Sequence, residues 1–268
     1  MSYWHGKVVL ITGGGAGLGA KLATHFATAG ANLLLADIDA AALEQVQATL
    51  TPLGTRIACH MTDITDQESV DDLFRELDSQ FGQLDVLVNC AGRSARGAIL
   101  DTDPAQFQAL LDLNFLGTVR CTRAAAPRLL ETRGHLVNIG SLAAKMASRY
   151  LGAYPVSKFA VAAYTHQLRL ELGPAGLHVL LVCPSPIARP DAGQRYRAQS
   201  AHLPASAQKP GGGVHVKGLD PDALAQRILR ACEQRVPELV LPAKARLLAA
   251  ILQLWPTWGD RIIAHMTR

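Results

Sequence analysis

Residues 10–23 read LITGGGAGLGAKLA and place five glycines within the seven consecutive positions 13–19. Each ordered glycine loses more backbone freedom than other residues, at a cost of roughly 0.5–1 kcal/mol relative to alanine. The preceding KVVLIT, residues 7–12, predicts a short buried strand, and residues 17–29 have the apolar spacing of a helix. A glycine-rich turn between the two points backbone N–H groups and a helix dipole at one place, which suits a phosphate or diphosphate. The alternative is a tight turn that only packs helix against strand.

Composition places the chain among folded globular proteins. Its 268 residues are 49% hydrophobic and 18% charged, which allows a substantial core and favours one large α/β domain. The net charge of +4 comes from scattered basic residues, so no nucleic-acid surface is predicted. The five cysteines have neither CxxC nor metal-ligand spacing, so we expect no disulfide framework and no metal. No signal-peptide core or spanning segment is evident, and a cytoplasmic location is expected.

Apolar runs alternate with helical patterns along most of the chain. The seven strand-like runs are 7–12, 31–36, 55–61, 84–89, 135–139, 177–183 and 238–241. Helical spacing covers about 17–29, 39–50, 66–81, 104–131, 153–173 and 221–234. This alternation predicts an α/β fold of three layers, a doubly wound parallel sheet with helices on both faces. Ligands of such sheets bind at the carboxyl ends of the strands, where the strand order reverses.

Two segments fall outside the alternation. Residues 190–218 are rich in Gly, Pro and Ser, and we expect a mobile substrate lid there, because so long a loop in a compact domain is usually a lid or a disordered link. Residues 243–268 are strongly apolar with basic flanks, and Pro256 is expected to kink a helix there. That helix is expected to close the substrate pocket or cover a subunit contact, with a membrane surface as the alternative. We therefore expect one domain over 1–242 and a helical extension of it over 243–268.

Asp37 directly follows the second strand-like run, about 20 residues after the glycines. In dinucleotide-binding folds an acidic side chain at this place accepts hydrogen bonds from the adenosine ribose. The 2′-phosphate of NADP would meet a like charge here, and neither Ile38 nor Ala16 supplies a cation. NAD is therefore expected in preference to NADP. The alternative is an aspartate that caps the helix beginning near Asp39.

Polar groups also follow the fourth and fifth runs. NCAGRS, residues 89–94, contains Gly92, which would let backbone lie close to a ligand, with an ordinary loop as the alternative. Ser141 follows the fifth run, and Tyr154 and Lys158 lie four residues apart, hence on one face of a helix. A neighbouring ammonium group lowers the pKa of tyrosine below its usual value of about 10 and favours the phenolate. Such a pair also arises by chance on solvated helices, but Ser141 ahead of it favours a catalytic set.

These motifs, in this order, resemble the short-chain dehydrogenase/reductase family, with its TGxxxGxG cofactor turn and YxxxK active site, over about residues 7–241. The resemblance implies a Rossmann fold and NAD(P)-dependent interconversion of a secondary alcohol and a ketone by hydride transfer. The catalytic residues it implies are Asn114, Ser141, Tyr154 and Lys158. The cofactor-binding residues are expected to be Thr12, Gly13, Gly15, Ala16, Gly17, Leu18, Gly19, Asp37, Ile38, Asp63, Ile64, Asn89, Ala91, Gly92, Tyr154, Lys158, Pro184 and Ile187. A homodimer or homotetramer formed through helices near 104–131 and 153–173 is also implied.

Two positions depart from the family pattern. Cys90 replaces the second Asn of the family's NNAG segment, and Arg189 stands where a threonine usually binds the nicotinamide amide. For Arg189 the alternatives are a phosphate contact, an acidic substrate and a solvated loop arginine. The apolar lid and tail favour a hydrophobic substrate, lipid-, steroid- or acyl-like. A non-catalytic dinucleotide-binding sensor or scaffold is the alternative function, although it would be expected to have lost Tyr154 or Lys158.

Overall fold

A computed structural model describes residues 2–189, 196–208, 211 and 218–266. Its centre is a seven-stranded sheet of order β3-β2-β1-β4-β5-β6-β7, with every neighbouring pair parallel. The strands are β1 (Val8–Thr12), β2 (Asn32–Asp37), β3 (Ile57–Met61), β4 (Val86–Asn89), β5 (His135–Ile139), β6 (His178–Pro184) and β7 (Glu238–Leu241). The predicted parallel sheet is confirmed. Its order reverses between β1 and β4, so a crevice for a ligand is expected at their carboxyl ends.

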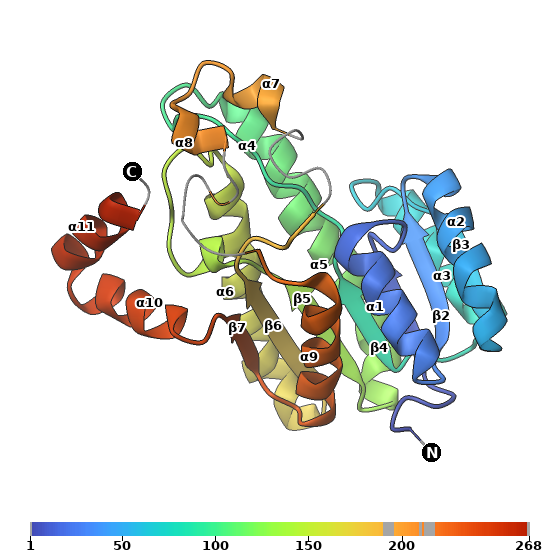
Figure 1. The fold of residues 1–268 in the computed structure, drawn as a ribbon. Helices are drawn as coiled ribbons and strands as arrows, with labels where there is room; N and C mark the ends of the chain where they lie inside the picture. Colours follow the sequence, from blue (N-terminus) through green and yellow to red (C-terminus); the bar gives the residue numbers. More distant parts are fainter. Residues whose placement is uncertain (1, 190–195, 209–210, 212–217, 267–268) are drawn as a thin grey trace.

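Helices cover both faces of this sheet (Figure 1). One face carries α1 (Gly17–Thr28), α2 (Ala40–Leu50) and α9 (Pro221–Glu233), and the other carries α3 (Gln67–Gln80), α5 (Gly117–Glu131) and α6 (Tyr154–Leu172). The helix expected over 104–131 is interrupted: α4 (Pro104–Leu111) joins α5 through a π-helical turn, Asp112–Leu116. Short 3-10 turns occupy Thr51–Leu53, Leu142–Ala144 and Gly173–Ala175.

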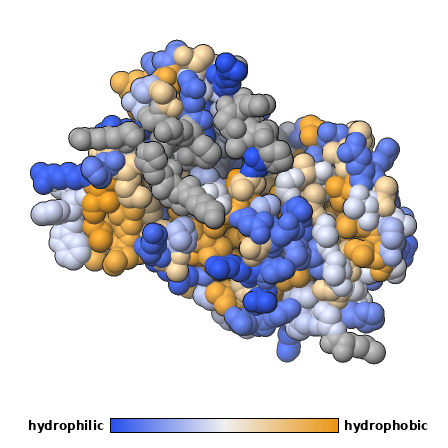
Figure 2. Space-filling view, in the orientation of Figure 1, coloured by the Kyte–Doolittle hydropathy of each residue, from blue (hydrophilic) through white to orange (hydrophobic). Residues whose placement is uncertain are grey.

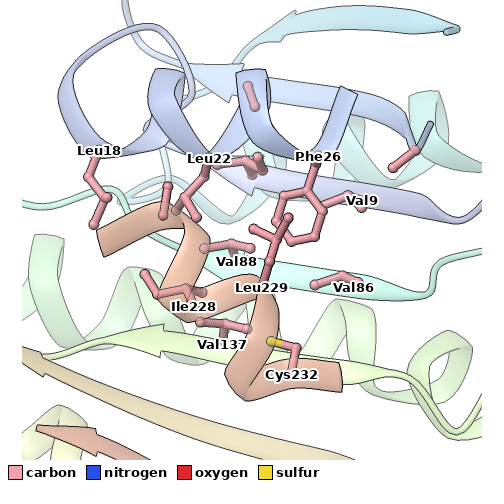
Figure 3. Packing of buried hydrophobic residues seen from close by; sticks show 14 of the residues in the cluster. Val9, Leu18, Leu22, Phe26, Val86, Val88, Val137, Ile228, Leu229 and Cys232 are labelled. Carbon is pink, nitrogen blue, oxygen red and sulfur yellow. The ribbon is translucent and has the colours of Figure 1, made fainter. Parts of the chain in front are cut away.

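The packing of α1 against α9 fixes the start of α1 relative to the sheet (Figure 3). Leu22 and Phe26 of α1 are fully buried beside Ile228 and Leu229 of α9, and all four cover the middle of the sheet. Burial of each such side chain stabilises the fold by about 1.5–3 kcal/mol. The N-terminus of α1 is therefore held firmly at the carboxyl edge of β1.

The segment expected to form a lid is described only in part. Residues 196–208 contain two short helices, α7 (Arg197–Ser200) and α8 (Ala205–Gln208). Residues 190–195, 209–210 and 212–217 lie outside the described residues, and the predicted mobility of the lid remains a prediction.

The C-terminal extension forms a pair of helices. Pro256 separates α10 (Ala245–Leu254) from α11 (Pro256–Met266), so the expected kink is a complete break. The pair projects from the β7 edge (Figure 1), and its apolar side chains gather on the surface seen in Figure 2. Trp255 and Trp258 are 59% and 64% exposed. Among the described residues, no helix has both the length and the apolar character needed to cross a membrane.

Candidate active site

The glycine-rich loop joins the end of β1 to the start of α1, and its glycines meet different surroundings. A Cβ added to Gly13 (φ 70°) would lie 2.9 Å from the Ala91 backbone, and one on Gly19 would lie 1.9 Å from the Gly13 oxygen. The protein's own backbone therefore excludes side chains at both positions. At Gly17 (φ 55°), the nearest described atom to such a Cβ is Nη1 of Arg189, at 3.9 Å. Among the described residues, none therefore fills the space beside Gly17 at the N-terminus of α1.

The start of α1 suits an anion. Ala16 at the N-cap makes no side-chain capping bond, and the first turn carries no acidic residue. Its backbone N–H groups and the positive end of the dipole therefore favour a phosphate. The Thr12 hydroxyl accepts hydrogen bonds from the N–H groups of Cys90 (3.1 Å) and Ala91 (3.3 Å). This threonine ties the ends of β1 and β4 together, so the loop and residues 89–92 form one wall.

Asp37 lies at the end of β2, beside the same loop. Its carboxylate accepts hydrogen bonds from the N–H of Gly15 (3.0 Å) and of Asp39 (3.2 Å). The N-cap of α2 is Asp39, whose side chain accepts the Ala42 N–H, so the alternative capping role of Asp37 is wrong. Ile38, next along the chain, is 67% exposed. The structure thus brings a carboxylate to the loop and an apolar side chain to its rim.

The other expected cofactor residues lie at the ends of β3 and β6. The Asp63 carboxylate accepts hydrogen bonds from the N–H (2.8 Å) and hydroxyl (2.7 Å) of Thr65, and Ile64 beside it is buried. Pro184 is the last residue of β6, and Ile187 pairs with Leu219 in an isolated bridge. All of these residues lie at or just beyond the carboxyl ends of parallel strands, the edge at which ligands of such sheets bind.

Asn89 is placed differently from its neighbours. Its side chain is buried, and Nδ2 donates to the Thr122 hydroxyl (3.1 Å) and to Oδ1 of Asn138 (2.9 Å). Nδ2 of Asn138 in turn donates to the Thr165 hydroxyl (2.9 Å). The Asn89 side chain therefore belongs to a polar chain inside the protein that joins β4 and β5 to α5 and α6.

Ser141, Tyr154 and Lys158 meet beyond the end of β5. Tyr154 is the first residue of α6, and its phenol is hydrogen-bonded to the Ser141 hydroxyl. Lys158 follows one turn later, and its Nζ donates to the Ile139 carbonyl at 2.8 Å. The two side chains share one helix face, as expected from their spacing. The arrangement brings a phenol, a hydroxyl and an ammonium group together, with Lys158 buried and the other two half-buried.

The electrostatics of this site differ from the expectation. Burial raises the pKa of Tyr154, although the hydrogen bond from Ser141 opposes the rise. Burial also lowers the pKa of Lys158 to about 8. The cation that lowers the Tyr154 pKa is Arg96, and its effect is smaller than that of burial. The pKa of Tyr154 is therefore raised rather than lowered, and Lys158 is not among the groups that shift it, contrary to the expected depression.

Asn114 connects this site to the loop after β4. It lies in the π-helical turn, where Oδ1 accepts the Arg93 N–H (2.9 Å) and Nδ2 donates to the Arg93 carbonyl (2.9 Å). Nδ2 also donates to the Ser157 hydroxyl (2.9 Å), which donates to the Tyr154 carbonyl (2.8 Å). A Cβ on Gly92 would lie 2.7 Å from Oδ1 of Asn114. The Asn114 side chain thus positions both Gly92 and Arg93 after β4 and the first turn of α6.

Sequence reasoning missed three residues near Tyr154. Ser157 was detectable, since it lies three residues after Tyr154 on the same helix. Arg96 and Tyr196 were not, because the guanidinium lies over a ring 100 positions away in sequence, at 4.4 Å from its centroid. Nε of Arg96 also donates to the Ala207 carbonyl at 3.0 Å. Arg96 thus ties the loop after β4 to residues 196–208 beside the phenol.

Comparison with known proteins decides the family. The profile described as short chain dehydrogenase matches residues 7–201. The chain belongs to the short-chain dehydrogenase family. This short-chain dehydrogenase is 32% identical over 277 residues to dehydrogenase/reductase SDR family member 7B of Danio rerio, covering 98% of this chain and 86% of the relative.

Two further likenesses extend over most of this short-chain dehydrogenase. Probable oxidoreductase EphD of Mycobacterium bovis is 30% identical over 264 residues, which cover 95% of this chain and 44% of EphD. The chain thus spans less than half the length of that relative. The crystal structure of a short chain dehydrogenase/reductase from Burkholderia phymatum in complex with NAD superposes with a TM-score of 0.81, at 28% identity and 95% and 96% coverage of the two chains.

Proposed function

We propose that this short-chain dehydrogenase interconverts a secondary alcohol and a ketone with a nicotinamide dinucleotide. The observation that carries the proposal is the meeting of Ser141, Tyr154 and Lys158 in one site at the edge where the glycine loop lies. When bound, the nicotinamide ring supplies or accepts the hydride. The uncapped start of α1 and the open side of Gly17 support a diphosphate there, as does a structural neighbour at 28% identity in complex with NAD.

Tyr154 is the proton donor and acceptor in this proposal. In the reducing direction its phenol donates a proton to the ketone oxygen, and in the oxidising direction the phenolate removes the hydroxyl proton. The Ser141 hydroxyl, hydrogen-bonded to that phenol, stabilises the same substrate oxygen as charge develops on it. Lys158 supplies positive charge from its fixed place on the Ile139 carbonyl. Asn114 orients these groups through Ser157.

NAD is the proposed cofactor in preference to NADP. The Asp37 carboxylate stands at the end of β2, next to the glycine loop, where a ribose hydroxyl would donate to it and a 2′-phosphate would be repelled. Its neighbours on this rim, Ile38 and Ala16, are exposed and uncharged. Both features support a ribose that lacks a phosphate group.

The proposed substrate has a hydrophobic body. The aromatic ring of Tyr196 comes from residues 196–208 and lies against the Arg96 guanidinium, and both residues act electrostatically on Tyr154. An aromatic ring at this place suits an apolar carbon skeleton. A lipid-, steroid- or acyl-like alcohol is the class that we propose.

The proposed assembly is a homodimer or homotetramer. An exposed apolar stripe follows α6 at intervals of three, four and seven residues: Val156, Phe159, Ala163 and Leu170. This spacing places the four side chains on one helix face, as in a helix–helix contact. The exposed apolar face of α10 and α11 supports a second contact, with a copy of the chain or with a membrane surface.

The test of this function is a screen of secondary alcohols and ketones with NAD(H) and NADP(H), followed by the absorbance of the reduced nicotinamide. We expect turnover of hydrophobic members of the set, with NAD(H) as the better cofactor. Tight binding of a dinucleotide with no turnover of any substrate would instead indicate a non-catalytic sensor or scaffold.

A further inference from the structure

The backbone before Arg189 is fixed to the rest of the fold. Ile187 pairs with Leu219 in an isolated β-bridge, and the Ala188 N–H donates to the Leu219 carbonyl at 2.7 Å. The Leu219 N–H donates to the Pro186 carbonyl at 2.9 Å. Arg189 therefore begins from an anchored segment beyond the carboxyl end of β6, on the same edge of the sheet as the glycine loop.

The Arg189 side chain reaches the start of α1. Its Nη1 lies 3.9 Å from the position of a Cβ on Gly17. In the sheet, β6 and β1 are separated by β4 and β5. The guanidinium thus joins two parts of the carboxyl edge that are not neighbours, and it ends beside the backbone that the fold offers to an anion.

The charges around Gly17 favour a strongly anionic group. The start of α1 has neither a capping side chain nor an acidic residue in its first turn, so no side chain of the helix itself offsets the partial positive charge of its dipole. A guanidinium adds a full positive charge and several N–H donors, which match phosphate oxygens. The nearby Asp37 carboxylate is hydrogen-bonded to the N–H groups of Gly15 and Asp39.

We propose that Arg189 binds the diphosphate of the dinucleotide, together with the backbone N–H groups at the start of α1. The inference rests on the proposed function and adds a specific anchor to it. Arg189 replaces the threonine expected from the family resemblance, so this chain substitutes a charge-assisted contact with phosphate for a side-chain contact with the nicotinamide amide. Its place beside Gly17 favours this role over a contact with an acidic substrate, because the substrate oxygen is bound at Tyr154.

The test compares the affinities of three probes, NADH, ADP and adenosine, measured by calorimetry on the full chain. Arg189→Thr is expected to weaken NADH and ADP about tenfold or more, because a charged hydrogen-bonding partner of the phosphates is lost. Adenosine, which has no phosphate, should bind unchanged. Arg189→Lys should lose less, and the affinity of Arg189→Thr for ADP should fall less steeply with salt than that of the wild type.

Arg75→Thr is the matched control. This substitution removes the same charge from α3, where Arg75 pairs with Asp72. Equal affinity of wild type and Arg189→Thr for ADP and NADH would overturn the inference. A parallel loss for adenosine would also overturn it, because the arginine would then act on the shape of the loop. Failure of the wild type to bind any dinucleotide would instead overturn the proposed function itself.

Discussion

Tyr154 is half-buried and hydrogen-bonded to the Ser141 hydroxyl, and desolvation raises the pKa of its phenol. The neutral phenol is the form that donates a proton, so ketone reduction should proceed at a constant rate through neutral pH and slow only in alkaline solution. Alcohol oxidation needs the phenolate and should accelerate over the same alkaline range. Tyr154→Phe should lower both rates by a factor of about 100 or more while NADH binds with nearly unchanged affinity. Rate profiles against pH in both directions measure this, and an active phenylalanine variant would contradict the assignment.

Asp37 should decide the choice of cofactor. Replacement by alanine removes both the acceptor for the ribose and the charge that repels a 2′-phosphate, so the preference for NADH over NADPH should shrink about tenfold. Fluorescence titration of wild type and Asp37→Ala with the two reduced cofactors measures the ratio. Tighter binding of NADPH than of NADH by the wild type would count against this role.

A chain of hydrogen bonds through two buried histidines lies at the opposite end of the sheet. His178 Nε2 faces the Val236 carbonyl at 2.8 Å, so that nitrogen carries the proton and Nδ1 is an acceptor. His135 Nδ1 lies 2.9 Å from it and donates, and its Nε2 accepts from the Tyr3 hydroxyl at 2.8 Å. Every ring nitrogen of the two histidines has a hydrogen-bond partner while both rings are neutral. Burial, followed by the His178 charge, lowers the pKa of His135 to about 3.

The histidine chain should make the fold sensitive to acid. Between about pH 6.5, the value in an unfolded chain, and pH 3 the unfolded state binds a proton that folded His135 does not, so stability falls as pH falls. Between pH 7 and pH 4.5 we expect this residue to lower the free energy of unfolding by about 2 kcal/mol. Urea unfolding of wild type and His135→Gln at both pH values tests it. The variant should be less stable at pH 7 but lose less on acidification, whereas exposed His202→Gln should behave as wild type. An equal acid loss in His135→Gln would refute the account.

An added methyl group should destabilise the glycine-rich loop much more than it destabilises the end of a helix. A Cβ on Gly19 would meet the Gly13 oxygen at 1.9 Å, so Gly19→Ala should displace the loop, cost about 2–3 kcal/mol and weaken NADH binding. Gly173 has a helical φ of −56° and no atom within 4 Å of an added Cβ among the described residues. Gly173→Ala has only the clash of its Cβ with the ring of Pro174 to overcome and should cost at most about 1 kcal/mol. Thermal melts with NADH titrations compare them; similar melting points would contradict the close contact.

Patterns in sequence predicted the elements well where periodicity is local. The runs around β1 to β7 gave the sheet because buried parallel strands are continuous in Val, Leu and Ile. The π-helical turn at Asn114 was not predicted, since a single widened turn within residues 104–131 has no periodic signature. The capping role of Asp39 rather than Asp37, and the approach of Arg96 to Tyr196, depend on side-chain geometry that spacing alone does not contain. Spacing therefore predicted that Ser141, Tyr154 and Lys158 lie together, but not the pKa shifts at the candidate site.

For the assembled molecule, the apolar stripe on α6 is the surface that we expect to join subunits. Phe159 lies within this stripe and is 44% exposed. Phe159→Glu would place a charge in the contact and should therefore shift the protein toward the monomer. Leu53→Glu is the matched control, since Leu53 is also 44% exposed but lies after α2. Light scattering after size-exclusion chromatography gives both masses. An unchanged mass for Phe159→Glu would place the subunit contact elsewhere.

The measurement that tests the account most directly is a crystal structure of the protein with NADH. We expect the diphosphate against the backbone at the start of α1, with Gly17 beneath it, and the nicotinamide ring beside the Tyr154 phenol. A dinucleotide bound away from the glycine loop, or a ring remote from Tyr154, would contradict the proposed hydride transfer.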